Sequence, residues 1–294
     1  MLLAMSARQR SLGWTNGRVV DRLDVAGSSL FETVYTHPRL APSHEHSYPY
    51  VAVLLKGRYR EIYRHGEAYF TPFTAVFHPA NVKHSCVLNE RGCRFFTLEL
   101  EPSWMDSLHI GVLANSVFDW HGERILWQML RLLREFHAKD TQSILTVESL
   151  TLEILANIGG ERQIGSRLPF HRWTLLQEKI HESFREPIRT RDLATAAGIH
   201  PVHVARLFRL KTGVTPGEYL QHLRAQCACR LMQGSERSLG EIASESGFAD
   251  QSHMNRILRR LVHCSPGKLR WLIYGKSGLM DTRSSSFRFV RTLD

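Results

Sequence analysis

Short apolar runs separated by turn residues occupy the first third of the chain. Each run is four to seven residues long, and prolines, glycines or polar residues interrupt the pattern between runs. Many short strands at close spacing are typical of a β-barrel or a β-sandwich. The predicted strands are Leu30–Tyr35, Tyr50–Leu55, Tyr59–Tyr63, Ala75–His78, His84–Leu88 and Arg94–Leu100, with breaks at Pro38–Pro42, Lys56-Gly57, His65-Gly66, Pro79–Asn81 and Arg91-Gly92.

Two amphipathic segments follow these runs. Glu123–His137 and Leu145–Ile158 place their apolar residues at helical spacing. The pair either packs on the barrel or meets the same helices of a second subunit, and the residues alone leave both readings open. Glu161–Pro169 is polar and contains Gly165, so it is interpreted as a domain linker, and His171–Phe184 as the helix that opens the next domain.

The last third of the chain contains one pattern written twice. Ile188–Leu220 and Ser238–Leu272 each predict a short helix, a glycine turn and a second helix with basic residues, at an offset of 49 to 50 residues. Glycine tolerates the positive φ that such a turn requires. This is the layout of a helix-turn-helix, whose second helix enters the DNA major groove. The matching positions are Ala194 and Ala243, Gly198 and Gly247, Arg206 and Arg256, and Pro216 and Pro266.

The second helix of each copy divides into an apolar and a polar face. Arg206 and Arg256 suit guanine, because the guanidinium fork matches its O6 and N7 atoms, whereas Asn and Gln suit adenine. Glu218–Gln233 predicts a connecting helix that sets the distance between the two copies. The predicted DNA-contacting residues are Val202, His203, Ala205, Arg206 and Arg209 in the first copy, and Gln251, Ser252, Asn255, Arg256 and Arg259 in the second.

These motifs resemble the AraC/XylS family of transcription regulators. The resemblance covers about the last hundred residues and implies a sequence-specific DNA-binding protein that forms a homodimer, more often an activator that contacts RNA polymerase. The chain departs from the family pattern at His253, Met254, Leu258, Leu269 and His263. His263 stands at a usual glycine position, so it is expected to adopt positive φ. The matching residues of the second copy are Ile242-Ala243, Gly247-Phe248, Asp250, Ser252, Arg256, Arg259-Arg260, Ser265-Pro266 and Arg270.

Charge is concentrated in the half that carries the repeat. The whole chain has a formal net charge of +10. Residues 171–294 hold 20 Lys and Arg against 11 Asp and Glu, a net of +9, whereas residues 1–170 hold 18 against 17, a net of +1. A basic domain fits binding to DNA phosphates. Double-stranded DNA is therefore the expected partner.

The cysteines and the N-terminus favour a cytoplasmic protein. The five cysteines are odd in number and lack metal-ligand spacing, so they are interpreted as reduced thiols. The first ten residues have no long apolar core before Arg8, and no run approaches the length of a membrane span. We therefore expect no signal peptide and no membrane partner.

The order of His44-x-His46, Gly57, Pro79 and His84 resembles a cupin barrel. In one large branch of the AraC/XylS family such a barrel is the sensory domain, which implies a small-molecule effector. A mostly apolar pocket with a few polar groups would bind it. The candidate effector-binding residues are His44, His46, Tyr48, Tyr50, Tyr63, His78 and His84.

A catalytic cupin would bind a metal through His44, His46, His84 and a carboxylate. The stretch after His46 contains no carboxylate, and Glu45 would point to the opposite face of a strand. No metal or other cofactor is therefore expected. Because the chain also lacks a nucleophile–base pair, a glycine-rich phosphate loop and a nucleotide motif, no catalysis is expected.

The sequence predicts a multidomain α+β protein. The alternatives left open are a metal-dependent cupin enzyme with a helical appendage and a constitutive DNA-binding dimer without an effector. The predicted divisions are an N-terminal extension (1–27), a cupin-like β-barrel (28–120), a helical pair that could form a dimer (121–160), a linker (161–170), a tandem helix-turn-helix domain (171–274) and a polar tail (275–294).

Overall fold

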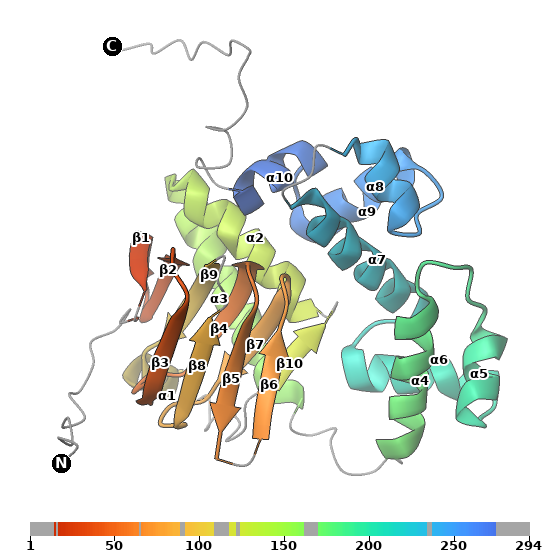
Figure 1. The fold of residues 1–294 in the computed structure, drawn as a ribbon, viewed down its shortest axis with the longest axis horizontal. Coiled ribbons are helices and arrows are strands. Elements are labelled where there is room, and N and C mark those ends of the chain that lie inside the picture. The colour runs from red at the N-terminus through yellow and green to blue at the C-terminus, as the bar shows by residue number, and fades with distance from the viewer. Residues whose placement is uncertain are drawn as a thin grey trace, which may run out of the picture.

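The chain folds into a β-rich N-terminal part and a helical C-terminal part (Figure 1). The computed structural model describes residues 15, 17–64, 66–88, 92–108, 118–121, 124–161, 170–233 and 237–274. The predicted linker and polar tail lie almost entirely outside these residues. None of the described helices combines the length and the hydropathy that crossing a membrane requires.

Two antiparallel sheets form the N-terminal part. The six-stranded sheet has the order β1-β2-β9-β4-β7-β10, and the four-stranded sheet has the order β3-β8-β5-β6. The first consists of β1 (Arg18–Val25), β2 (Ser28–Tyr35), β9 (Cys93–Leu100), β4 (Tyr50–Lys56), β7 (Thr74–His78) and β10 (Phe118–His121). The second consists of β3 (Arg39–His44), β8 (His84–Leu88), β5 (Tyr59–Tyr63) and β6 (Gly66–Phe70).

The six predicted strands are present, and the strands that sequence reasoning missed lie at sheet edges. The segment expected to be a break at Pro38–Pro42 belongs to β3, and the extension predicted for residues 1–27 contains β1. Pro42 is tolerated because β3 is an edge strand with an irregular register between Ala41 and His44. Edge strands carry exposed polar residues and so lack the apolar signal of buried strands.

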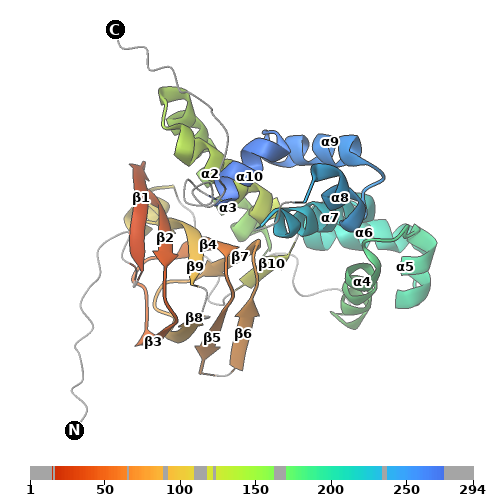
Figure 2. The same ribbon diagram turned by 45° about the horizontal axis from the view of Figure 1, so that its top comes forward.

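Helix α2 (Arg124–Ala138) lies between the six-stranded sheet and the C-terminal helices (Figure 2). Ten of its fifteen residues are buried, from Ile125 to Phe136. It packs against α3 (Thr141–Glu161), β7 and β10 on one side and against C-terminal helices on the other. Packing within the chain therefore accounts for the apolar face of α2, whereas the described part of α3 keeps two exposed leucines, Leu145 and Leu152. The short α1 (Pro102–Ser107) follows β9.

The C-terminal part repeats its backbone geometry. Gly198 and Gly247 both have positive φ, at 61° and 85°. After each glycine the next amide donates to the carbonyl of the matching alanine, Ile199 to Ala194 at 3.0 Å and Phe248 to Ala243 at 2.9 Å. The helices are α4 (Phe170–Ser183), α5 (Thr190–Ala197), α6 (Pro201–Thr212), α7 (Pro216–Met232), α8 (Leu239–Glu245), α9 (Gln251–Val262) and α10 (Pro266–Tyr274).

The two helix pairs belong to different hydrophobic cores. Helices α4, α5 and α6 pack around Trp173 and Phe208, together with Tyr219 of α7. Helices α8, α9 and α10 share one continuous core with α2, α3 and the six-stranded sheet. The second helix pair is therefore packed against the N-terminal part through α2.

Polar contacts reinforce this packing. Gln226 and Arg230 of α7 donate to the backbone carbonyls of Phe73 and Pro72, at 2.6 and 2.9 Å, in the connection that precedes β7. Arg134 of α2 donates to the carbonyl of His263 at 2.6 Å. The N-terminal part thus contacts the connecting helix and the end of α9.

Candidate functional site

Helix α6 presents the first set of predicted DNA-contacting residues. Pro201 occupies its first turn and the His200 ring caps it, and these two residues define where the helix begins. Val204 and Phe208 are fully buried, which turns the opposite face outward. Val202 is 68% exposed, and Arg206 forms no hydrogen bond or ion pair with other described residues. The residues on the open face are Val202, His203, Arg206 and Arg209, with Ala205 half-buried.

Helix α9 presents the second set. Asp250 caps its start by accepting a hydrogen bond from the His253 amide at 2.7 Å, and Met254 and Leu258 are buried. Asn255 is half-buried, and its Oδ1 atom is buried without a hydrogen-bond partner among the described residues. The predicted contacts Gln251, Ser252, Arg256 and Arg259 are exposed.

Neighbouring Arg260 has a structural contact. It donates to Gln221 of α7 at 2.5 Å, which joins α9 to the connecting helix. His263 ends α9 with φ at 53°, which confirms the expected positive φ. The left-handed conformation of this residue directs the chain into α10.

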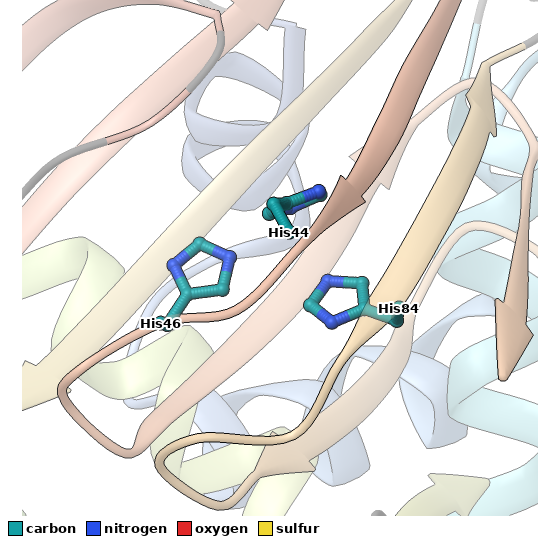
Figure 3. A group of neighbouring side chains, drawn as sticks. All are labelled: His44, His46 and His84. Atoms are coloured by element: carbon teal, nitrogen blue, oxygen red, sulfur yellow. The ribbon is translucent and has the colours of Figure 1, made fainter. Parts of the chain in front are cut away.

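Three predicted histidines come together at one end of the four-stranded sheet. Figure 3 shows the rings of His44, His46 and His84 around a common space, with His44 at the end of β3 and His84 at the start of β8. One ring nitrogen from each lies within 4.8 Å of the others. Because β3 ends at His44, the strand alternation that we assumed for Glu45 does not apply to it.

Backbone carbonyls orient two of these rings. Nδ1 of His44 lies 2.8 Å from the Pro42 carbonyl, and Nδ1 of His84 lies 3.1 Å from the Val82 carbonyl. A carbonyl only accepts, so each Nδ1 carries a proton. Burial lowers the pKa of His84 to about 4, so its ring is neutral near pH 7. Nε2 of His84 is thus available as an acceptor or a ligand.

Glu61 is a residue of this candidate site that sequence reasoning missed. Its carboxylate on β5 is buried, lies 3.0 Å from Nε2 of His78 and accepts a hydrogen bond from the Tyr63 hydroxyl. Burial would raise the pKa of Glu61, but the neighbouring His78, His84 and Tyr63 lower it to about 2. The cupin pattern places a carboxylate shortly after His46, whereas Glu61 lies on the separate strand β5. The alternation of Tyr59, Glu61 and Tyr63 along β5 was the signal that could have located it.

The histidines border a cavity of about 80 Å³ between the two sheets. Of the predicted effector-binding residues, His44, His46, Tyr50 and His84 line it. His78 and Tyr63 instead contact the His84 ring, with centroids 5.0 and 6.2 Å away. Tyr48 is half-buried and is not among the lining residues. The remaining lining comes from Thr15, Phe31, Thr33, Tyr35, Ala52, Tyr59, Glu61, Cys86, Phe95, Thr97 and Glu99.

Comparison with known proteins identifies the helical part. A family model described as a helix-turn-helix domain matches residues 193–271. The HTH-type transcriptional regulator GlxA of Rhizobium meliloti is 34% identical over 93 residues, which are 32% of this chain and 29% of that protein. The chain therefore spans less than a third of GlxA.

Two further known proteins are similar to this chain. The uncharacterised HTH-type transcriptional regulator YbfI of Bacillus subtilis is 23% identical over 223 residues, covering 72% of this chain and 81% of YbfI. A solved structure of an AraC-type transcriptional regulator from Chromobacterium violaceum is 25% identical, with a TM-score of 0.34, and covers 36% of this chain and 94% of that one.

Proposed function

We propose that this chain, which carries an AraC-type helix-turn-helix domain, is a sequence-specific transcription regulator whose N-terminal part is a cupin-like barrel that binds a small-molecule effector. The observation that carries the proposal is the repeated helix pair. Arg206 and Arg256 occupy matching positions on its two second helices, and both are exposed and without described partners.

In this proposal α6 and α9 enter two successive major grooves on one face of the duplex. Helix α7 separates them and has 17 residues, a rise of about 25 Å. Successive major grooves lie about 34 Å apart, so a rigid connector of this length suits a two-part site. Arg206 and Arg256 would each contact guanine, and Arg259 at the end of α9 would contact phosphate.

Effector control would act through the contacts between the two parts of the chain. An effector that binds one arrangement of the domains more tightly shifts the population toward that arrangement. The cavity lies between the sheets, and α2 connects the six-stranded sheet to α9 and α10. We expect the regulator to work in the cytoplasm and, if it activates, to contact RNA polymerase.

We propose that α3 forms the interface of a homodimer. Leu145 and Leu152 are 64% and 43% exposed and stand seven residues apart, which places them on one face of the helix. A two-fold dimer would bring this face against its own copy.

The test is a gel shift with DNA from upstream of the protein's own gene. Each bidentate arginine contact is worth about 1–3 kcal/mol, so Arg206→Ala and Arg256→Ala should each weaken specific binding by about 5- to 150-fold. Arg22→Ala removes an exposed arginine on β1 and is the matched control. Binding of both variants at the strength of the unchanged protein would rule out this assignment of the DNA contacts.

A second candidate is a constitutive DNA-binding dimer whose barrel serves only for association. The small volume of the cavity, about 80 Å³, favours it. The two candidates differ in whether any small molecule changes DNA affinity. Gel shifts repeated with metabolite extracts would separate them, because the constitutive protein would bind equally in every extract.

A further inference from the structure

A second cluster of ligand-type side chains lies beside the three histidines of Figure 3. One atom each from Glu61, His78 and His84 lies within 4.8 Å of the others. These residues come from β5, β7 and β8, and they are only 2%, 1% and 3% exposed. His44 and His46, in contrast, are half-buried. The two clusters share His84, and all three side chains of the second are buried.

His78 has unsatisfied hydrogen-bonding capacity. Its Nε2 lies 3.0 Å from Oε2 of Glu61, yet neither ring nitrogen forms a hydrogen bond of acceptable geometry with a described residue. The Tyr50 ring stacks on it with centroids 4.7 Å apart, which holds the imidazole in place. A buried polar atom without a partner is destabilising, and an ion or a water molecule commonly accounts for it.

The charge of Glu61 also requires compensation. Burying an ionised carboxylate is costly unless a cation is close. Among the described residues, Glu61 forms an ion-pair contact with His78 and with no lysine or arginine. A dication would neutralise the carboxylate and would at the same time bind the imidazole nitrogens of His78 and His84.

We propose that Glu61, His78 and His84 bind a divalent transition-metal ion of the zinc or iron(II) type. Two imidazoles and one carboxylate are a ligand set for both ions. Ligands about 2.1 Å from one ion lie about 3.0 Å apart in an octahedral site and about 3.4 Å apart in a tetrahedral one, so the 3.0 Å between Nε2 of His78 and Oε2 of Glu61 fits two ligands of a single ion. The Val82 carbonyl holds the His84 ring with Nε2 available, a support that metal-bound histidines generally have.

The proposal distinguishes this site from one formed by His44, His46 and His84. That outer set consists of three imidazole rings and contributes no negative charge. The inner set supplies an anion from a buried side chain, where attraction to a dication is stronger than at the surface. Because Glu61 and His84 also line the cavity, the ion would border the space where an effector would bind.

Metal content of the full-length protein tests the proposal. The protein is stripped with a chelator, dialysed against Zn²⁺ or Co²⁺, and measured by mass spectrometry. We expect one ion per chain, retained by the double variant His44→Ala/His46→Ala. Glu61→Gln and His78→Gln should each lower affinity at least tenfold. Glu67→Gln, on the exposed face of β6, is the matched control and should bind like the unchanged protein.

Any other pattern overturns the proposal, including no bound ion or loss of the ion from the His44/His46 double variant. Near-ultraviolet circular dichroism shows whether each variant is folded. X-ray absorption of the unchanged protein loaded with Zn²⁺ gives a measurement that needs no variant. Two imidazoles with oxygen ligands are expected, and three imidazoles would assign the ion to the outer set.

Discussion

Arg94 on β9 donates from Nη1 to the backbone carbonyl of Ile273 on α10 at 2.6 Å. Its Nη2 donates to Glu32 on β2 at 2.5 Å, and both side chains are buried. The neighbouring residues Phe95 and Thr33 line the cavity. Successive residues of a strand face opposite sides of the sheet. The cavity and helix α10 therefore lie on opposite faces of the six-stranded sheet, separated by strand β9.

Arg94→Ala should lower the free energy of unfolding by about 3–5 kcal/mol, because it removes the arginine that pairs with the buried Glu32 carboxylate and leaves His137, whose Nε2 lies 3.5 Å away, as its remaining ion-pair contact among the described residues. Urea unfolding followed by circular dichroism measures this. Arg22→Ala breaks the exposed pair with Asp24 and should cost less than about 1 kcal/mol. Equal effects of the two substitutions would contradict the role assigned to Arg94.

Gly247→Ala should destabilise the protein by about 2 kcal/mol or more. The residue has a φ of 85°, and an added Cβ would lie 2.6 Å from the Arg185 backbone, which has no room to move. Gly217→Ala is the matched substitution, since a Cβ there meets no atom and the site is helical. It should raise stability by about 0.5–1 kcal/mol. Thermal unfolding should show a lower melting temperature for Gly247→Ala and a higher one for Gly217→Ala than for the unchanged protein.

His263→Gly should stabilise the protein by roughly 0.5 kcal/mol. The left-handed conformation costs a non-glycine residue about 1–2 kcal/mol, and the greater freedom of glycine in the unfolded chain offsets part of the gain. The bond from Arg134 goes to the backbone carbonyl, so it survives the change. His203→Gly, which places a glycine inside α6, should instead lower the free energy of unfolding by about 1 kcal/mol. A lower melting temperature for His263→Gly would refute the expectation.

Acid should weaken the cap of α7. The Thr215 amide and hydroxyl donate to Glu218 and lower the pKa of its carboxyl group below 4.5. A lowered pKa in the folded state gives stability that is present above about pH 4.5 and is lost as the pH falls through the folded value. The side chain is exposed, so the effect is at most about 0.5 kcal/mol. Glu218→Gln keeps an acceptor but does not titrate, so its stability should fall less between pH 6 and pH 3 in urea unfolding.

Arg259→Ala should weaken DNA binding at every sequence equally, if Arg259 contacts phosphate. The slope of log affinity against log salt should become shallower by about 0.9, the contribution of one phosphate contact. Arg256→Ala should lower the preference for the specific site over unrelated DNA. Fluorescence anisotropy at several salt concentrations measures both. If Arg259→Ala instead lost the preference for the specific site, Arg259 would be the base contact and Arg256 the phosphate contact.

The sequence by itself determined the helical repeat and the buried strands. Gly198 and Gly247 specify the turns, because glycine adopts positive φ freely. The helices that follow them are recognisable because their apolar residues recur at the helical period. The strands from β2 to β9 that lie inside the sheets carry apolar residues on consecutive or alternating positions, so their pattern is readable without knowing their neighbours.

Tertiary structure decided the rest. Edge strand β3 exists because His44 pairs with His84, forty residues away, although Pro42 reads locally as a break. Glu61 joins the histidines only because β5 pairs with β8. Helices α8, α9 and α10 share a core with the sheet because α2 lies between them. Each of these relationships depends on residues distant in the sequence, and a local pattern carries no information about which of them will meet.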